Sequence, residues 1–291
     1  MNHETGILLV DKPKGITSFG VLNKIKKKFG IKKIGHAGTL DPDATGLLIV
    51  LLGAATKLQR YITDEKKTYS GEIKLGIQTN TNDTTGEVTA TKDVPSLSDA
   101  NIESALSSFI GEHRQVPPAF SAIKKDGVRA YELARKGEDV LLEERLVTLF
   151  DAKLRIIDDT TLSYRVTCSK GFYVRSFARD LSQALGTLGV TDSIRRESSA
   201  GVGLERTVRL EELLEMEELP MFEVTDFLKQ LQRVNCSKEE YSRLILGRAD
   251  VVAEINGRID PDKEALLLID NKIFAGMLGA GGVEFLVPGL S

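Results

Sequence analysis

The chain has 291 residues, 41% of them hydrophobic, which is enough to bury a sizeable core in one large domain or two unequal ones. Charged residues make up 28% and nearly balance, leaving a formal net charge of -3, whereas nucleic-acid enzymes usually carry a basic face. The lysines are unevenly spread, however, and several of them gather between residues 24 and 33. This run fits either a basic binding surface or an ordinary solvated helix face.

Cysteine and histidine usage argues against two further classes of protein. Cys168 and Cys236 are too few for a disulfide framework and favour a reducing compartment. The histidines are far apart and lack paired cysteines, so we expect no structural zinc site. We find neither a signal-peptide pattern nor an apolar run approaching the ~20 residues that span a bilayer. We therefore expect a soluble, cytoplasmic protein that needs no metal.

The first two thirds of the chain predict strands that follow one another and isolated helices, rather than a regular strand-helix-strand series. The clearest helix signals are Thr17 or Ser18 as an N-cap and Gly30 as a stop. Apolar runs and period-two alternation mark the strands. Strands are predicted at residues 6–11, 46–52, 67–75, 146–157 and 161–168, helices at 18–29, 99–110, 131–136 and 174–185, and loops at 80–86 and 116–121.

The pattern changes beyond about residue 230. A short charged helix at 238–246 precedes three short apolar segments, at 251–255, 265–269 and 273–277, which we interpret as strands separated by Gly, Asn and Asp turns. We expect a small all-β domain here. The fold class predicted for the whole chain is α+β, with a central, mainly antiparallel sheet flanked by helices and with domains at residues 1–230 and 231–291.

The most informative segment is GHAGTLDPDATG, at residues 35–46, directly before an apolar run. Pro42 fixes its own φ and favours an extended conformation at Asp41. A carboxylate on such a turn, beside a buried strand, is placed as a reacting group would be. Asp-Pro is also a common turn starter, and on local sequence alone a structural turn is the more common explanation of Asp41.

Five stretches taken together resemble the TruB-type tRNA pseudouridine synthases. They are DKPKGITS (11–18), GHAGTLDPDATG (35–46), KTYSGEIKLG (67–76), VPPAFSAIKKDGVRAYELARKG (116–137) and CSKGFYVRSFARDL (168–181). The order and spacing agree with the family from about residue 6 to residue 202, and DPxATG and SKGxYxR are the most specific strings. The C-terminal piece stands where family members carry a small PUA-like RNA-binding domain.

The resemblance implies an isomerase that converts a uridine in the T-loop of tRNA, at position 55, to pseudouridine, without a cofactor and as a monomer. It implies Asp41 as the catalytic aspartate, Arg175 as its partner, and Tyr69 as the ring that stacks on the target base and takes part in proton abstraction. Supporting or RNA-contacting positions that it implies are His36, Tyr173, Lys12 and Pro13.

The residue types agree with that chemistry. A carboxylate nucleophile divides one difficult displacement into easier steps, and a guanidinium can hold it ionised in a dry pocket. A paired base must be flipped out to reach it, and aromatic rings offer stacking platforms. Lys124, with its neighbour Lys125 and with Arg129, is a candidate phosphate contact.

Other interpretations remain open from the sequence alone. Tyr69 fits a packing role in an alternating strand, and Arg175 an ordinary surface position. Asp43, where the family usually has an apolar residue, puts a second carboxylate two residues from Asp41 and weakens the benefit of Arg175 if it points inward. A non-catalytic tRNA-binding or folding factor is the main functional alternative, and a glycosidase-like hydrolase lacks an identifiable acid partner.

Overall fold

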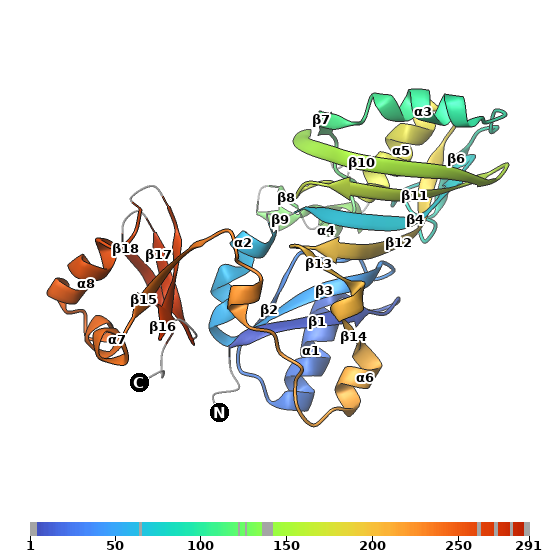
Figure 1. Cartoon of the computed structure of the whole chain (residues 1–291). Coiled ribbons are helices and arrows are strands. Elements are labelled where there is room, and N and C mark those ends of the chain that lie inside the picture. The colour runs from blue at the N-terminus through green and yellow to red at the C-terminus, as the bar shows by residue number, and fades with distance from the viewer. Residues whose placement is uncertain are drawn as a thin grey trace.

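The structure is a computed structural model that describes residues 5–63, 66–121, 123–125, 127–135, 142–260, 263–270, 273–279 and 282–287. Its central feature is a large mixed sheet with the strand order β14-β1-β3-β12-β4-β11-β10-β7, to which β2 and β13 add at β3 and β12 (Figure 1). The strands are β1 (Gly6–Lys12), β2 (Ile34–Ala37), β3 (Thr45–Leu52), β4 (Lys67–Leu75), β7 (Gly111–Gln115), β10 (Arg145–Asp158), β11 (Thr161–Cys168), β12 (Gly189–Ser199), β13 (Val202–Gly203) and β14 (Val208–Arg209).

Most neighbouring strands of this sheet are antiparallel, and only the β1–β14 and β3–β12 pairs are parallel among those described. The predicted mainly antiparallel α+β architecture is therefore confirmed. The helical segments of this part are α1 (Ser18–Phe29), η1 (Gly53–Leu58), α2 (Gln59–Thr63), α3 (Asp99–Ser107), α4 (Ala130–Arg135), α5 (Val174–Ala184), η2 (Leu204–Arg206), α6 (Leu210–Glu215) and η3 (Val224–Asp226). Two small hairpins are β5 (Ile77–Thr79) with β6 (Val88–Thr91), and β8 (Lys124–Lys125) with β9 (Val128–Arg129).

The predicted ends of the first helix and the predicted start of the helix at 99–110 are confirmed, whereas the latter helix ends at Ser107, three residues earlier than predicted. The Thr17 hydroxyl accepts a hydrogen bond from the Gly20 amide at 2.9 Å and so caps α1, while Gly30 ends it in a left-handed conformation at φ 66°. Ser98 caps α3 in the same way as Thr17 caps α1. The predicted end of the helix at 131–136 lies partly outside the described residues, because α4 is described to Arg135.

Strand β3 is buried on both faces, as its apolar run predicts. Leu47, Ile49 and Leu51 belong to one apolar cluster, and Leu48 and Leu52 to another on the opposite face. The second cluster also contains Val21, Leu22 and Ile25 of α1 and Leu210 and Leu213 of α6. The loop that precedes β3 therefore starts from one of the most firmly packed strands of the molecule.

The C-terminal part is a four-stranded sheet, in the order β15-β16-β17-β18, with two helices. Its elements are β15 (Gln232–Cys236), α7 (Lys238–Ile245), α8 (Ala249–Asn256), β16 (Ala265–Ile269), β17 (Ile273–Gly279) and β18 (Gly282–Leu286). The predicted small C-terminal β sheet is present, consistent with a PUA-like domain.

The predicted strand at 251–255, and with it the all-β description, is wrong. These residues form α8, in which Val251 and Ile255 are buried and Val252 is partly buried. Val251 and Ile255 are four residues apart and share one helix face, although Val251, Ala253 and Ile255 would equally share one face of a strand. The β-branched composition suggested a strand, but packing of this face against β16 decided for a helix.

The two sheets share apolar contacts. Every residue of β16 is buried, and its two faces belong to different clusters. Leu267 and Ile269 pack with α7 and α8, whereas Leu266 and Leu268 join the cluster that contains Leu51 of β3. Figure 1 shows the same arrangement, with α7 and α8 on the outer side of the C-terminal sheet and α2 on the inner side.

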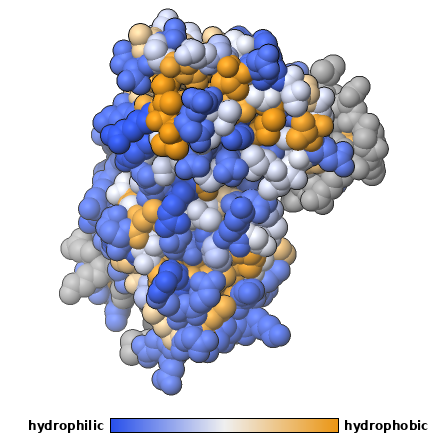
Figure 2. Space-filling view, turned by 90° about the vertical axis from the view of Figure 1, so that its right-hand side faces the viewer, coloured by the Kyte–Doolittle hydropathy of each residue, from blue (hydrophilic) through white to orange (hydrophobic). Residues whose placement is uncertain are grey.

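Figure 2 shows the face at the right of Figure 1, where apolar groups gather mostly in the upper half and hydrophilic groups cover most of the lower half. Several apolar side chains are exposed in β6 and β10, namely Val88, Leu146, Phe150, Ile156 and Ile157. Among the residues that the structure describes, no helix is long and apolar enough to cross a bilayer.

Candidate active site

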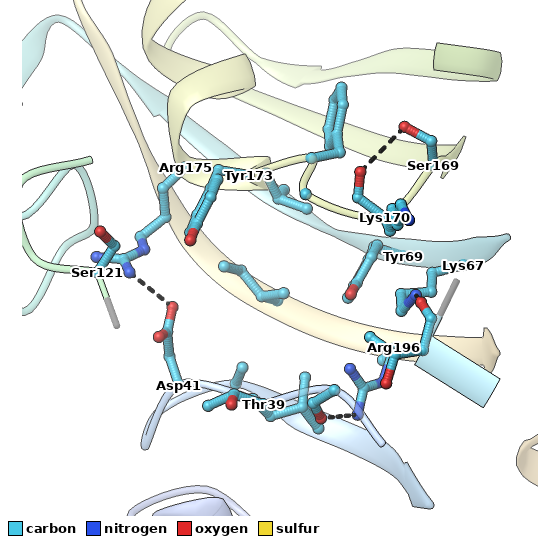
Figure 3. Close-up of a pocket in the computed structure, with 18 residues that line it drawn as sticks. Thr39, Asp41, Lys67, Tyr69, Ser121, Ser169, Lys170, Tyr173, Arg175 and Arg196 are labelled. Carbon is cyan, nitrogen blue, oxygen red and sulfur yellow. Dashed lines mark hydrogen bonds and ion pairs between the residues drawn. The ribbon is translucent and has the colours of Figure 1, made fainter. Parts of the chain in front are cut away.

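A cavity of about 270 Å³ opens where β4, β12, the loop before β3 and the start of α5 meet (Figure 3). This volume is near the small end of ligand pockets and suits one small group. Its walls combine apolar, aromatic and cationic side chains. The lining residues are Gly38, Thr39, Leu40, Asp41, Ala44, Thr63, Lys67, Tyr69, Ser121, Ser169, Lys170, Gly171, Phe172, Tyr173, Val174, Arg175, Ile194 and Arg196.

Asp41 lies on the loop between β2 and β3. Hydrogen bonds from the start of α1 and from the segment before it hold this loop in place. The Ser18 hydroxyl accepts from the Leu40 amide at 2.9 Å and donates to the Leu40 carbonyl at 3.1 Å. The Gly15 amide and the Lys12 ammonium both donate to the Pro42 carbonyl, each at 2.9 Å. A carboxylate on a loop held in this way is presented in one orientation, which catalysis by positioning requires.

Arg175 pairs with Asp41, its Nη2 lying 2.9 Å from Asp41 Oδ2. The arginine belongs to the first turn of α5, and its side chain is 5% exposed, whereas that of Asp41 is 43% exposed. The buried cation is thus fixed while the carboxylate stays partly exposed, and Figure 3 shows the two side chains directed toward each other. The sequence-predicted pair is brought together.

Arg175 has a second carboxylate partner that the sequence reasoning missed. Asp83 Oδ2 lies 3.5 Å from Arg175 Nη1, and Asp83 Oδ1 accepts from the Thr85 amide at 3.1 Å and from the Thr81 hydroxyl at 2.7 Å. The carbonyls of Thr81 and Phe120 accept from the same guanidinium at 2.9 and 2.8 Å. The only available signal was the run of polar turn residues at 80–86, which said nothing of where that loop would point.

Asp43 is exposed and is not among the residues that line the cavity. The concern that it would compete with Asp41 for Arg175 therefore does not arise in this structure. The second carboxylate that contacts Arg175 is that of Asp83, which is distant from Asp41 in the sequence.

Tyr69 and Tyr173 both line the cavity and come from different elements, β4 and the N-cap position of α5. Burial raises the pKa of each hydroxyl; for Tyr69 the main opposing influence is the nearby Arg196 cation. Gln115 holds the backbone of Tyr173 from both sides, accepting from its amide at 2.8 Å and donating to its carbonyl at 3.2 Å. The two rings are therefore available as platforms for a flat ligand.

Three other predicted residues, Lys12, Pro13 and His36, are described with their side chains and are not on the cavity wall. Lys12 is fully buried and donates to the carbonyls of Pro13, Ile16 and Pro42, at 2.8, 2.7 and 2.9 Å, so it holds the Asp41 loop rather than facing a ligand. Burial lowers the pKa of Lys12 to about 8. Pro13 contributes a carbonyl to this set.

His36 lies on β2, half-buried, with its Nδ1 lacking a hydrogen-bond partner among the described residues. Burial, and then the Arg196 cation, lowers its pKa. Lys124 is described only through its backbone, in β8. The predicted RNA contacts of these two residues stay predictions.

Arg196, on β12, is a wall residue that the sequence did not identify. Its side chain is fully buried, yet no carboxylate pairs with it among the described ion pairs. Its neighbour Arg195 points the other way and binds Asp11 at 2.7 Å. The basic pair at 195–196 was visible in the sequence, but alternation along a strand places only one of two adjacent side chains on each face.

The arrangement suits nucleophilic chemistry on a small planar group. It offers an ion-paired carboxylate, aromatic rings, and the cations Lys67, Lys170 and Arg196 on its wall. The cations fit an electron-rich or anionic ligand. Across the described part of the chain, no three or more His, Cys, Asp or Glu side chains are grouped in a way that could hold a metal ion.

Comparisons with known proteins point in one direction. The family model "TruB family pseudouridylate synthase (N terminal domain)" matches residues 26–174. The chain is similar to the tRNA pseudouridine synthase B of Ruegeria sp. (strain TM1040), with 43% identity covering 95% of this chain and 93% of the relative. It is also similar to the tRNA pseudouridine synthase B of Syntrophotalea carbinolica, with 38% identity covering 86% and 84%.

A solved structure supports the fold. A chain in the crystal structure of a Cbf5-Nop10-Gar1 complex superposes with a TM-score of 0.69 over 96% of this chain and 79% of that one. The sequence identity is 22%, so this likeness speaks for the architecture alone.

Proposed function

The chain belongs to the TruB family of pseudouridylate synthases, and from this premise we propose that it isomerises a uridine of tRNA to pseudouridine. The observation that carries the proposal is the ion pair of 2.9 Å between Arg175 and Asp41 at a cavity lined by Tyr69 and Tyr173. The relatives that share this sequence over most of its length are named for that activity on tRNA.

Asp41 is the proposed nucleophile. Isomerisation breaks the bond from the ribose to N1, turns the base and rejoins it through C5, so a group must hold one fragment while the other turns. A carboxylate can do so by forming a covalent intermediate, and it reacts in its ionised form. Arg175 favours that form through a charge-assisted hydrogen bond, and the half-exposed Asp41 can reach a ligand without breaking the pair.

The size of the cavity supports a substrate that enters one nucleotide at a time. A volume of about 270 Å³ cannot take a stacked, paired base together with its neighbours. The target base must therefore be flipped out and stacked against a ring, at an unstacking cost that is lowest in loops. We propose the uridine at position 55 in the T-loop of tRNA, with the T-arm as the principal recognition element.

A non-catalytic tRNA-binding factor is not favoured. Binding alone does not require a carboxylate that is oriented by a buried arginine and left open to the cavity. The curated relatives are named as synthases, and this chain retains the predicted trio of Asp41, Tyr69 and Arg175 at one cavity.

The test uses unmodified tRNA labelled with tritium at C5 of uridine, because replacement of the C5 hydrogen releases tritium to water. We expect release with the native chain and essentially none with Asp41→Asn, while tRNA binding is retained. Asp43→Asn is the matched control, since it removes an exposed carboxylate two residues away, and we expect its rate to be near native. Binding without release by the native chain would instead favour the non-catalytic factor.

The position of the product is tested separately. Chemical mapping of pseudouridine on full tRNA and on an isolated T-arm hairpin should show one modified site, at position 55, in both. Modification at another position, or none in the hairpin, would overturn the proposed recognition element without overturning the isomerase.

A further inference from the structure

The cavity wall contains a buried cation whose part in the chemistry is not accounted for by the Asp41–Arg175 pair. Arg196 is 0% exposed, and two of its nitrogen atoms are committed to backbone oxygens. Nε donates to the Leu47 carbonyl at 2.7 Å, and Nη2 donates to the Gly38 carbonyl at 3.0 Å. These bonds fix the plane of the guanidinium between β3 and the loop that leads to Asp41.

The third nitrogen of this guanidinium, Nη1, makes neither of these bonds. Nη1 is buried and has no hydrogen-bond partner among the described residues. A buried donor without a partner costs about 1–3 kcal/mol, so its retention at a cavity wall calls for a reason. Arg196 also has no carboxylate partner in any ion pair of the described residues.

Tyr69 is the residue that this charge faces. Arg196 and Tyr69 are directly opposite each other on the antiparallel strands β12 and β4, so their side chains leave the sheet on the same face. Figure 3 shows both side chains at the cavity, with the Tyr69 hydroxyl directed toward the loop that carries Asp41. The guanidinium of Arg196 therefore connects the two proposed reacting groups, Asp41 and Tyr69. It is bonded to the loop that carries Asp41, and it lies against Tyr69.

We propose that Arg196 is a positioning residue for the proton-transfer step, which holds the Tyr69 oxygen in place and stabilises negative charge on it. This inference rests on the proposed function. When C5 has joined the ribose, it still carries its hydrogen. Tyr69 enters this step as the phenolate, having given its proton to water, and N1 has taken a proton from water on leaving the ribose. The phenolate oxygen accepts the C5 proton, and the C–H bonding pair restores the C5–C6 double bond, which cancels the positive charge that C–C bond formation left on the N1–C6 unit. The accepted proton then exchanges with water.

The charge of Arg196 acts in the direction that this step needs. Burial raises the pKa of the Tyr69 hydroxyl and so disfavours the phenolate, while the Arg196 cation opposes that rise. Cys168 and Asp41 act in the same sense as burial but more weakly. A cation held in a buried cavity stabilises the phenolate more strongly than a cation exposed to water would.

The first test measures Tyr69 without relying on activity. A chain with 3,5-difluorotyrosine at position 69, whose phenol is more acidic, is titrated by fluorine NMR. We expect Arg196→Gln to raise the midpoint by at least about one unit and Arg196→Lys, which keeps the charge, to raise it less. Arg195→Gln is the matched control, because Arg195 is adjacent in sequence but binds Asp11, and it should leave the midpoint unchanged. An unchanged midpoint in Arg196→Gln overturns the proposal.

The second test measures the chemical step. In single-turnover tritium release, Arg196→Gln should be about tenfold slower than native at equal tRNA affinity, with a larger deuterium isotope effect at C5. A loss of rate without a larger isotope effect assigns Arg196 a purely structural part and overturns the proposal. If the native chain releases no tritium, the proposed function fails while the fluorine titration still decides whether the two side chains are coupled.

A third measurement covers the case in which no Arg196 variant folds. The difluorotyrosine chain keeps Arg196. Burial still raises the pKa at position 69, so ionisation should lower the melting temperature, but the opposing Arg196 cation should make this loss smaller than that at a buried tyrosine without a neighbouring cation. The same substitution at Tyr164, a buried tyrosine whose hydroxyl donates to the Ser193 carbonyl at 2.8 Å, should lower the melting temperature on ionisation. Equal losses at both positions would contradict a stabilising cation at Tyr69.

Discussion

At the scale of single residues, the site depends on two buried arginines that do different things. Arg175 is bonded to Asp41, and its two terminal nitrogens also contact Asp83 and the carbonyls of Thr81 and Phe120. Arg196 is bonded to the loop from below, leaving one nitrogen at the cavity. A planar guanidinium suits both positions, because its donors diverge in fixed directions that an ammonium cannot reproduce.

Asp83 offers a test of how Arg175 is held. Asp83→Asn keeps the shape and the contacts to the Thr81–Thr85 turn but removes the charge that faces Arg175 at 3.5 Å. We expect a tenfold to hundredfold slower single-turnover tritium release, corresponding to a charge-assisted bond of about 1.5–3 kcal/mol. Asp192→Asn, at an exposed carboxylate on β12, is the control and should be near native. A native rate in Asp83→Asn would show that Arg175 needs no second partner.

Lys12 gives a prediction about pH. Burial lowers its pKa to about 8 in the folded chain, against 10.5 when unfolded. The unfolded chain therefore binds more protons between these values, so this contribution to stability is absent below about pH 8 and grows as the pH rises toward 10.5. We expect the free energy of unfolding of the native chain to increase relative to Lys12→Met across this window, by on the order of 2–3 kcal/mol.

The measurement for Lys12 is urea unfolding at a series of pH values. Lys14→Met, at an exposed position two residues on, serves as the control and should run parallel to the native chain. If the Lys12→Met curve also runs parallel to the native curve, folding does not lower the pKa of Lys12, and the prediction is wrong.

At the scale of elements, the site depends on the position of β12, which lies between β3 and β4 in the sheet. Arg196 is opposite Tyr69 on one side and opposite Gly46 on the other. Gly46 adopts φ 100°, and a Cβ there would come 2.3 Å from the Arg196 carbonyl oxygen. The backbone of β12 can approach the Asp41 loop so closely only because position 46 has no side chain.

Gly46→Ala should therefore damage both fold and site. We expect a loss of at least about 2 kcal/mol in the free energy of unfolding, from the positive φ and from displacement of β12. Gly35→Ala, on the neighbouring β2, is the control, because its Cβ would meet Thr56 only at an ordinary 3.4 Å. Equilibrium unfolding in urea measures both, and equal losses would contradict the assigned role of Gly46.

At the scale of the whole molecule, the two sheets are joined by a shared apolar cluster and by surface contacts. Leu266, Leu268 and Phe274 of the C-terminal sheet join the cluster of β3. Arg60, on α2, pairs with Glu264 at 2.8 Å and with Glu284 at 3.1 Å, although such exposed pairs contribute little. The chain is therefore expected to unfold as one unit. The domain boundary at residue 230, the monomeric state and the cytoplasmic location stay predictions.

Phe274→Ala tests this coupling. The ring is 5% exposed within the shared cluster, so its removal should cost about 3 kcal/mol and lower the melting temperature of both sheets in a single transition. Leu246→Ala, at a side chain that is 78% exposed, should change the stability by less than about 0.5 kcal/mol. Two separate transitions in Phe274→Ala, by calorimetry, would show that the sheets fold independently.

The sequence by itself determined the strands β1, β3 and β4, the helix from Thr17 to Gly30 and the family, because apolar periodicity, caps and the motif around Asp41 are local signals. The strand predicted at residues 251–255 is wrong, because their β-branched composition favours a strand whereas they form a helix. Only the tertiary structure decided that Asp83 reaches Arg175, that Lys12 and Asp43 face away from the cavity, and that Arg196 lies against Tyr69. Those relations depend on the register of distant strands and on which face each side chain takes, and neither is written in any short stretch of the chain.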